Sequence, residues 1–112
     1  MDEGAIMKKL TLNEQIFLIA IWHLGDEAYG VKIREKIMEI TGQEMMFGTI
    51  YNTLDKLVKK GHVSTRPGGE STEERGGYKK VFYALTPEGR QALRKARELQ
   101  DNLWADIPSS AF

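Results

Sequence analysis

The first run of apolar residues in the chain predicts a helix that is apolar on almost every side. A T-x-x-E pattern typical of a capping box begins at Thr11, and the run continues to about Leu24, where Gly25 is a natural end. The segment IFLIAIWHL in this run has no polar face, whereas a helix at the surface of a monomer would have one. We therefore expect a partner subunit to cover the second apolar face, which includes Ile16 and Ile19.

Two shorter helices are predicted over residues 29–41 and 48–60, each followed by a glycine. Their core-facing positions, spaced by three and four, are Ile33, Ile37 and Ile40 in the former and Ile50, Leu54, Leu57 and Val58 in the latter. The link at 43–47, QEMMF, is short and has room for a brief strand. The two helices therefore form a candidate helix-turn-helix.

Two β-strands are predicted next, over residues 62–66 and 78–85, where β-favouring residues replace the helical spacing. Between them, residues 67–77 read PGGESTEERGG, with four glycines and almost no hydrophobic residue. Such a composition is typical of an exposed loop. The pattern therefore predicts a hairpin with a long tip, which is the wing of a winged helix.

The last predicted helix opens at Thr86 and Pro87, an N-cap followed by a first-turn proline. We expect it to run to about Ile107, because Pro108 would stop it. Its apolar seam follows spacings of four, three and four, and consists of Ala92, Ala96, Leu99 and Leu103. Since no other predicted element remains to cover this seam, we expect it to pack on another subunit.

The order of the elements predicts an α+β fold that is mostly helical, a winged helix-turn-helix with a C-terminal dimerisation helix. We assign residues 1–86 to a DNA-binding domain, 87–107 to the dimerisation helix and 108–112 to a tail. A chain of 112 residues has room for one ordinary domain.

Composition excludes several classes of function. The chain has no cysteine, which excludes disulfides, thiol catalysis and thiolate metal sites. The longest apolar run, at 16–24, is too short to span a membrane, and the first ten residues lack a signal-peptide pattern, so we expect a cytoplasmic protein. No phosphate loop or nucleophile elbow is present, and His23 and His62 have no neighbouring donor cluster. We therefore expect no enzyme activity, cofactor or metal.

Charge is unevenly distributed along the chain, although the formal net charge is +0. Residues 31–61 carry six basic and four acidic side chains, whereas residues 1–30 carry two basic and five acidic ones. A positively charged surface must therefore come from the middle of the chain. The zero total predicts only modest non-specific affinity for nucleic acid, because that affinity comes from phosphate neutralisation.

The outward face of the third helix has side chains suited to a DNA major groove. Its candidates for DNA contact are Thr49, Tyr51, Asn52 and Lys56. Tyr51 could donate its hydroxyl to a phosphate or could pack on the wing. Asn52 could pair with adenine or remain solvated. Asp55 would repel phosphate, so we expect it to pair with Lys59 one turn later.

The predicted hairpin adds basic side chains close to this helix. The candidates for DNA contact on the hairpin are Arg66, Arg75, Lys79 and Lys80. Three glutamates in the loop between the strands, Glu70, Glu73 and Glu74, offset part of that charge. We expect at least one of the basic side chains to contact the DNA backbone.

Three segments of the sequence resemble the PadR family of winged-helix regulators. They are residues 28–33 (AYGVKI), residues 48–63 (GTIYNTLDKLVKKGHV) and residues 78–90 (YKKVFYALTPEGR). The resemblance spans roughly residues 11–95, and the joint order of the motifs is more specific than any one alone. One departure is that Met46-Phe47 stand where the family often has a serine-like cap and a proline, which leaves the start of the third helix open.

The resemblance implies a homodimeric repressor whose third helix reads an operator, whose wing tip contacts DNA and whose last helix dimerises. With a single helix after the wing, the chain resembles the shorter group of the family, which often responds to small aromatic or phenolic molecules or to drugs. Trp22 and Trp104 are then candidates for stacking on a planar ligand, and the alternative is that both fill the dimer core. A winged-helix module that binds a protein and no DNA is the alternative function, favoured by the zero net charge.

Overall fold

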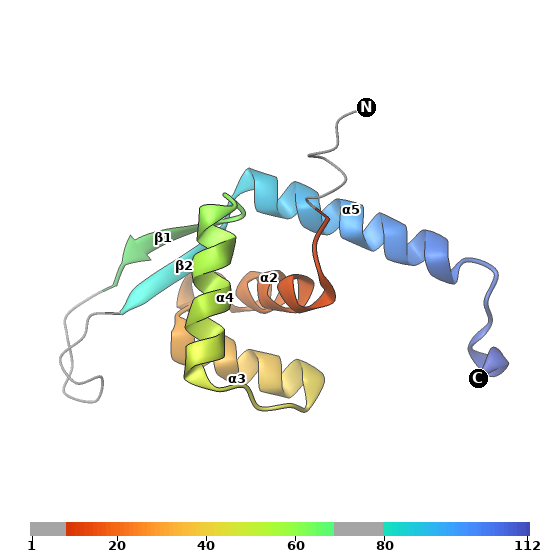
Figure 1. Ribbon diagram of the computed structural model, residues 1–112, viewed down its shortest axis with the longest axis horizontal. Coiled ribbons are helices and arrows are strands. Elements are labelled where there is room, and N and C mark those ends of the chain that lie inside the picture. Colours follow the sequence, from red (N-terminus) through yellow and green to blue (C-terminus); the bar gives the residue numbers. More distant parts are fainter. Residues whose placement is uncertain (1–8, 69–79) are drawn as a thin grey trace.

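The computed structural model describes residues 9–68 and 80–112. The elements, in chain order, are α2 (Leu12–Leu24), η1 (Gly25–Glu27), α3 (Gly30–Thr41), α4 (Phe47–Lys59), β1 (Val63–Pro67), β2 (Val81–Leu85), α5 (Pro87–Trp104) and η3 (Ser109–Ala111). Figure 1 shows α4 standing across α2 and α3, the hairpin on one side of it, and α5 extending away on the other side. The expected fold class, mostly helical with a two-stranded antiparallel sheet, is confirmed.

Local sequence signals account for most helix ends. The backbone N–H of Glu14 donates to the Thr11 hydroxyl at 3.1 Å, and the N–H of Thr11 donates to the Glu14 carboxylate at 2.9 Å, so the predicted capping box is formed. Gly42 ends α3 in the left-handed conformation at φ 75°, which glycine adopts without a steric cost.

Several expected elements differ from the structure, in which α3 begins at Gly30 and β1 covers Val63–Pro67. The link before α4 forms no strand, since the one sheet among the described residues consists of β1 and β2. α4 begins at Phe47, one residue before the expected start. α5 ends at Trp104 and not at Ile107, since a residue before proline disfavours helical dihedrals and Asp106 adopts a left-handed φ of 67°.

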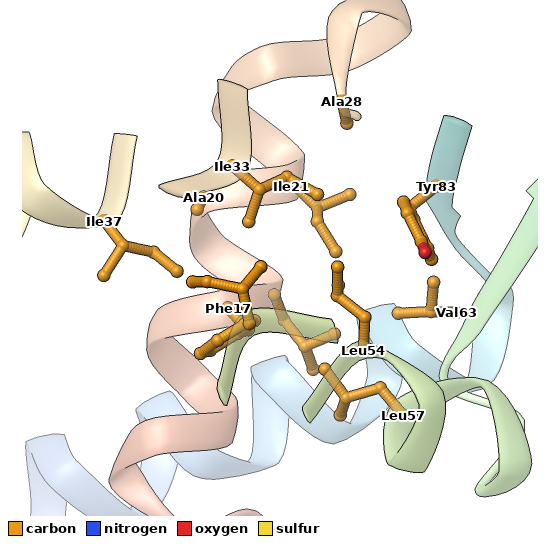
Figure 2. Close-up of a cluster of buried hydrophobic side chains, with 12 residues drawn as sticks. Phe17, Ala20, Ile21, Ala28, Ile33, Ile37, Leu54, Leu57, Val63 and Tyr83 are labelled. Carbon is orange, nitrogen blue, oxygen red and sulfur yellow. The ribbon is translucent and has the colours of Figure 1, made fainter. Parts of the chain in front are cut away.

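The hydrophobic core lies where the three N-terminal helices meet the hairpin (Figure 2). Its buried side chains include Phe17 and Ile21 from α2, Ile33 and Ile37 from α3, Leu54 and Leu57 from α4, and Val63 and Tyr83 from the hairpin. Ile40 is an exception, because it lies in the last turn of α3 and is 45% exposed. The expected core faces of α3 and α4 are otherwise confirmed.

The hairpin is attached to the start of α3. Its register pairs Val63 with Leu85 and Pro67 with Val81. The N–H of Tyr83 donates to the carbonyl of Ala28 at 2.8 Å, and Tyr29 forms an isolated bridge with Phe82. The base of the wing is therefore fixed against the helix-turn-helix through backbone hydrogen bonds.

A carboxylate links α2 to the end of α4. The Lys60 ammonium donates to the Glu14 carboxylate, which is almost fully buried. Burial by itself raises the pKa of Glu14, but the hydrogen bonds from Lys60 and Thr11 outweigh it, so that the pKa lies below its ordinary value of 4.5.

We expect this pair to make stability depend on pH in the acid range. Because the pKa of Glu14 is lower in the folded chain, its contribution is complete above about pH 4.5 and is lost as the pH falls through the folded value. Glu14→Gln should lower the free energy of unfolding at pH 7 by about 1–2 kcal/mol. Urea denaturation at pH 7 and pH 3.5 measures both effects.

The matched control is Glu39→Gln, which removes an exposed carboxylate whose partner is Lys36 at 3.2 Å. It should change stability by less than about 0.5 kcal/mol, as exposed pairs do. If Glu14→Gln loses as much stability between pH 7 and pH 3.5 as the unmodified chain does, the assigned role of Glu14 is wrong.

Candidate nucleic-acid interface

The outer surface of α4 is polar and lies opposite its core face. Ile50, Leu54 and Leu57 are fully buried. The exposed positions on the opposite side are Gly48, Thr49, Asn52, Asp55, Lys56 and Lys59. Three of the four predicted contact residues of this helix, Thr49, Asn52 and Lys56, therefore share one solvent-facing surface.

Tyr51 lies on the flank of α4 that faces α3. A Cβ placed on Gly30 would meet the Tyr51 hydroxyl oxygen at 2.2 Å, so the tyrosine packs directly over the first turn of α3. The absence of a side chain at Gly30 therefore permits the close approach of α3 and α4 at this point. Tyr51 remains 43% exposed.

Tyr83 of β2 supports this corner from inside the fold. Burial raises the pKa of the Tyr83 hydroxyl, and the nearby Tyr51 and Asp55 raise it further. Tyr83 therefore stays neutral at physiological pH, and it links the hairpin to the flank of α4 without adding charge.

The stem of the wing holds cationic side chains over aromatic rings. The Lys80 ammonium lies 4.4 Å from the Tyr29 ring centroid, and the Arg66 guanidinium lies 4.4 Å from that of Phe82. The two rings meet edge to face at 5.6 Å. Such contacts orient both cations while leaving their charge available. Arg75 and Lys79, also predicted to contact DNA, lie outside the described residues.

Arg34 is a cation that the sequence analysis did not single out. Its Nε donates to the carbonyl of Met45 at 2.6 Å, and its guanidinium lies 4.7 Å from the Phe47 ring centroid. Phe47 in turn stacks on Tyr51 at 6.3 Å. No periodicity marks this row of side chains, because it forms only when α3 and α4 pack together.

Lys56 and Lys59 on the α4 surface form no ion pair with the residues that the structure describes. Within residues 9–68 and 80–112, the pairs are Lys32 with Glu35, Lys36 with Glu39, and Lys60 with Glu14. The expected pair of Asp55 with Lys59 does not form in this part of the chain. Asp55 therefore adds a negative charge beside Lys56 and Lys59 on the same face.

α5 borders two clefts outside this surface. One, of about 600 Å³, lies between α2 and α5, and is lined by Ile19, Trp22, Leu93 and three arginines, Arg90, Arg94 and Arg97. The other, of about 340 Å³, includes Ala92, Ala96 and Leu99 of the predicted seam.

The remaining residues predicted for the interface or for effector binding lie in different surroundings. Leu103 is exposed and Ile16 is half-buried against the core. Trp22 lines the larger cleft, whereas Trp104 contacts Phe112 at the far end of α5.

Other kinds of site have no counterpart in the residues described. No group of three or more His, Cys, Asp or Glu side chains in residues 9–68 and 80–112 could hold a metal ion. None of the helices found there is long and apolar enough to cross a membrane. His23 is exposed beside Trp22, and His62 is buried at the start of the hairpin.

The helix-turn-helix, the hairpin and the first half of α5 together match one protein family. A model described as the Transcriptional regulator PadR-like family covers residues 19–95. The chain belongs to the PadR-like family of transcriptional regulators. A search of curated proteins finds no match.

Solved structures share the fold of this PadR-like regulator. RosR from H. salinarum is 27% identical with a TM-score of 0.68, over 90% of this chain and 83% of that one. A transcriptional regulator from Clostridium thermocellum is 22% identical with a TM-score of 0.66, over 92% and 90%. A winged-helix DNA-binding protein from STIV is 17% identical with a TM-score of 0.65, over 88% and 98%. The last two similarities concern the fold alone.

Proposed function

We propose that this PadR-like regulator is a homodimeric repressor in the cytoplasm that binds double-stranded operator DNA and is released by a small aromatic effector. The observation that carries the proposal is the polar surface of α4 beside a wing stem with two oriented cations. A helix with such a surface fits the major groove, while the wing reaches the adjacent backbone.

Each predicted contact has a place in this proposal. Thr49, Asn52 and Lys56 would face base edges and phosphates, because they share the outer surface of α4. The Tyr51 hydroxyl, at the first turn of α3, would donate to a backbone phosphate. The wing cations, Arg66, Arg75, Lys79 and Lys80, would add phosphate contacts.

Dimerisation and effector binding would use α5 and the outer side of α2. The proposal keeps residues 1–86 as the DNA-binding domain and 87–107 as the dimerising segment. Leu99 and Leu103 are exposed in the single subunit, as are Ile19 and Trp22, and a second subunit would cover them. The 600 Å³ cleft beside Trp22 would hold the effector, completed by Trp104 of a second copy.

Fluorescence anisotropy tests the DNA-binding part directly. The purified protein is titrated against its own promoter duplex and a scrambled duplex at the same salt concentration. We expect at least tenfold tighter binding to the promoter, equivalent to about 1.4 kcal/mol. Equal and weak binding to both would favour the protein-interaction alternative, which Asp55 on the α4 surface also favours.

Sedimentation tests the dimer separately. A monomer at micromolar concentration would contradict the proposed dimer.

Lys56→Ala should weaken DNA binding and its dependence on salt. If Lys56 neutralises one phosphate, the slope of log K against log salt concentration should decrease by about 0.9. The control is Lys36→Ala. The Lys36 ammonium is already paired with Glu39 in α3, so its removal should leave the slope unchanged. Equal slopes for both variants would remove Lys56 from the interface.

A further inference from the structure

The first residues of α4 form an exposed apolar tip. Met46 is the N-cap of the helix and is 79% exposed, and Phe47 follows it at 43%. The Met46 side chain makes no capping hydrogen bond, whereas Thr11 and Thr86 cap α2 and α5 through their hydroxyls. A polar N-cap would stabilise the helix by about 1 kcal/mol, so the tip forgoes stability where it also exposes hydrophobic surface.

The ring of Phe47 is held in place from both helices. Arg34 of α3 lies over it while bonded to the carbonyl of Met45, and Tyr51 stacks on it one turn later. Tyr51 is itself fixed against Gly30. The Phe47 part of the apolar tip is therefore preorganised, so that a ligand would meet a ring that loses little conformational entropy on binding.

The position of this tip determines which ligand it fits. In a helix-turn-helix, the N-terminal residues of the second helix contact base edges in the major groove. Thymine is the base that presents an apolar group there, its C5-methyl, and apolar side chains recognise it by contact. Thr49 and Asn52, the polar residues that follow on α4, suit the hydrogen-bonding groups beside that methyl.

We propose that Met46, next to the fixed ring of Phe47 in the chain, is a specificity determinant that contacts thymine methyl groups in the operator. The inference rests on the proposed DNA-binding function and extends it from the polar face of α4 to the apolar tip. It implies that each half-site contains A·T pairs where the start of α4 enters the groove.

Replacement of thymine by deoxyuridine removes only the methyl group and tests this contact. Duplexes are first enriched from a random-sequence pool by binding to the full chain. The enriched sequence is then synthesised with deoxyuridine at one thymine position at a time, and affinities are measured by anisotropy. We expect one or two positions per half-site at which the loss of the methyl weakens binding about fourfold.

Variants assign the effect to Met46. Met46→Gln keeps the length of an exposed side chain and should abolish the thymine preference at one of these positions, whereas Met46→Leu should retain it. Met38→Gln is the matched control, because Met38 is a partly exposed methionine on α3. It should keep the unmodified pattern.

The outcomes separate this inference from the function on which it rests. Enrichment of a defined sequence with full tolerance of deoxyuridine at every position would overturn the role of Met46 and leave the DNA-binding function standing. A preference that survives Met46→Gln would overturn the assignment to Met46. Failure to enrich any sequence would overturn both proposals, and would favour a protein partner for the apolar tip.

Discussion

Replacing Phe17 with alanine is expected to lower the free energy of unfolding by about 3–5 kcal/mol. The ring is fully buried at the centre of the core, where α2 meets α3 and α4 (Figure 2). The substitution removes a large apolar surface and leaves a cavity that rigid helices can only partly fill. Urea denaturation at a fixed protein concentration measures the loss, since association would otherwise alter the apparent stability.

Two further variants keep this prediction testable. Leu12→Ala truncates a residue of the same helix that is 66% exposed and should cost less than about 1 kcal/mol. Phe17→Leu keeps most of the apolar volume and serves if the alanine variant does not fold. A loss at Leu12 equal to the loss at Phe17 would contradict the place of Phe17 at the centre of the core.

Gly89→Ala is expected to lower the free energy of unfolding by about 1–3 kcal/mol, because it overpacks the joint between α5 and the wing. A Cβ at this buried position would lie 2.1 Å from the carbonyl oxygen of His62, which belongs to the backbone and cannot rotate away. The Thr86 hydroxyl, which donates to the carbonyl of Gly61 at 2.6 Å, holds the same joint together. Relief of the clash would require α5 to tilt away from the hairpin.

The control for this variant is Gly48→Ala, in the first turn of α4. A Cβ there would meet nothing within 4 Å, so alanine should leave stability unchanged or raise it by up to about 1 kcal/mol. Thermal unfolding of both variants gives the comparison, and sedimentation shows whether a tilted α5 also weakens the proposed dimer. Equal destabilisation by both substitutions would contradict the tight joint at Gly89.

The candidate site was only partly accessible to prediction. The outward position of Thr49, Asn52 and Lys56 follows from helical periodicity, because Ile50 and Leu54 must face the core. The environment of Tyr51 could not be predicted, since its neighbour Gly30 comes from another helix. Arg34 was missed for the same reason.

Local sequence by itself determined the elements of this PadR-like regulator. The capping box at Thr11, the proline after Thr86 and the glycine after α3 act within a few residues, so their effects can be read from the chain. Only the tertiary structure decided how those elements meet. The tyrosine over Gly30, the attachment of α5 at Gly89 and the fixed ring of Phe47 depend on distances between elements that lie apart in sequence. Periodicity states which face of a helix is buried, but it carries no information on which neighbour lies against that face.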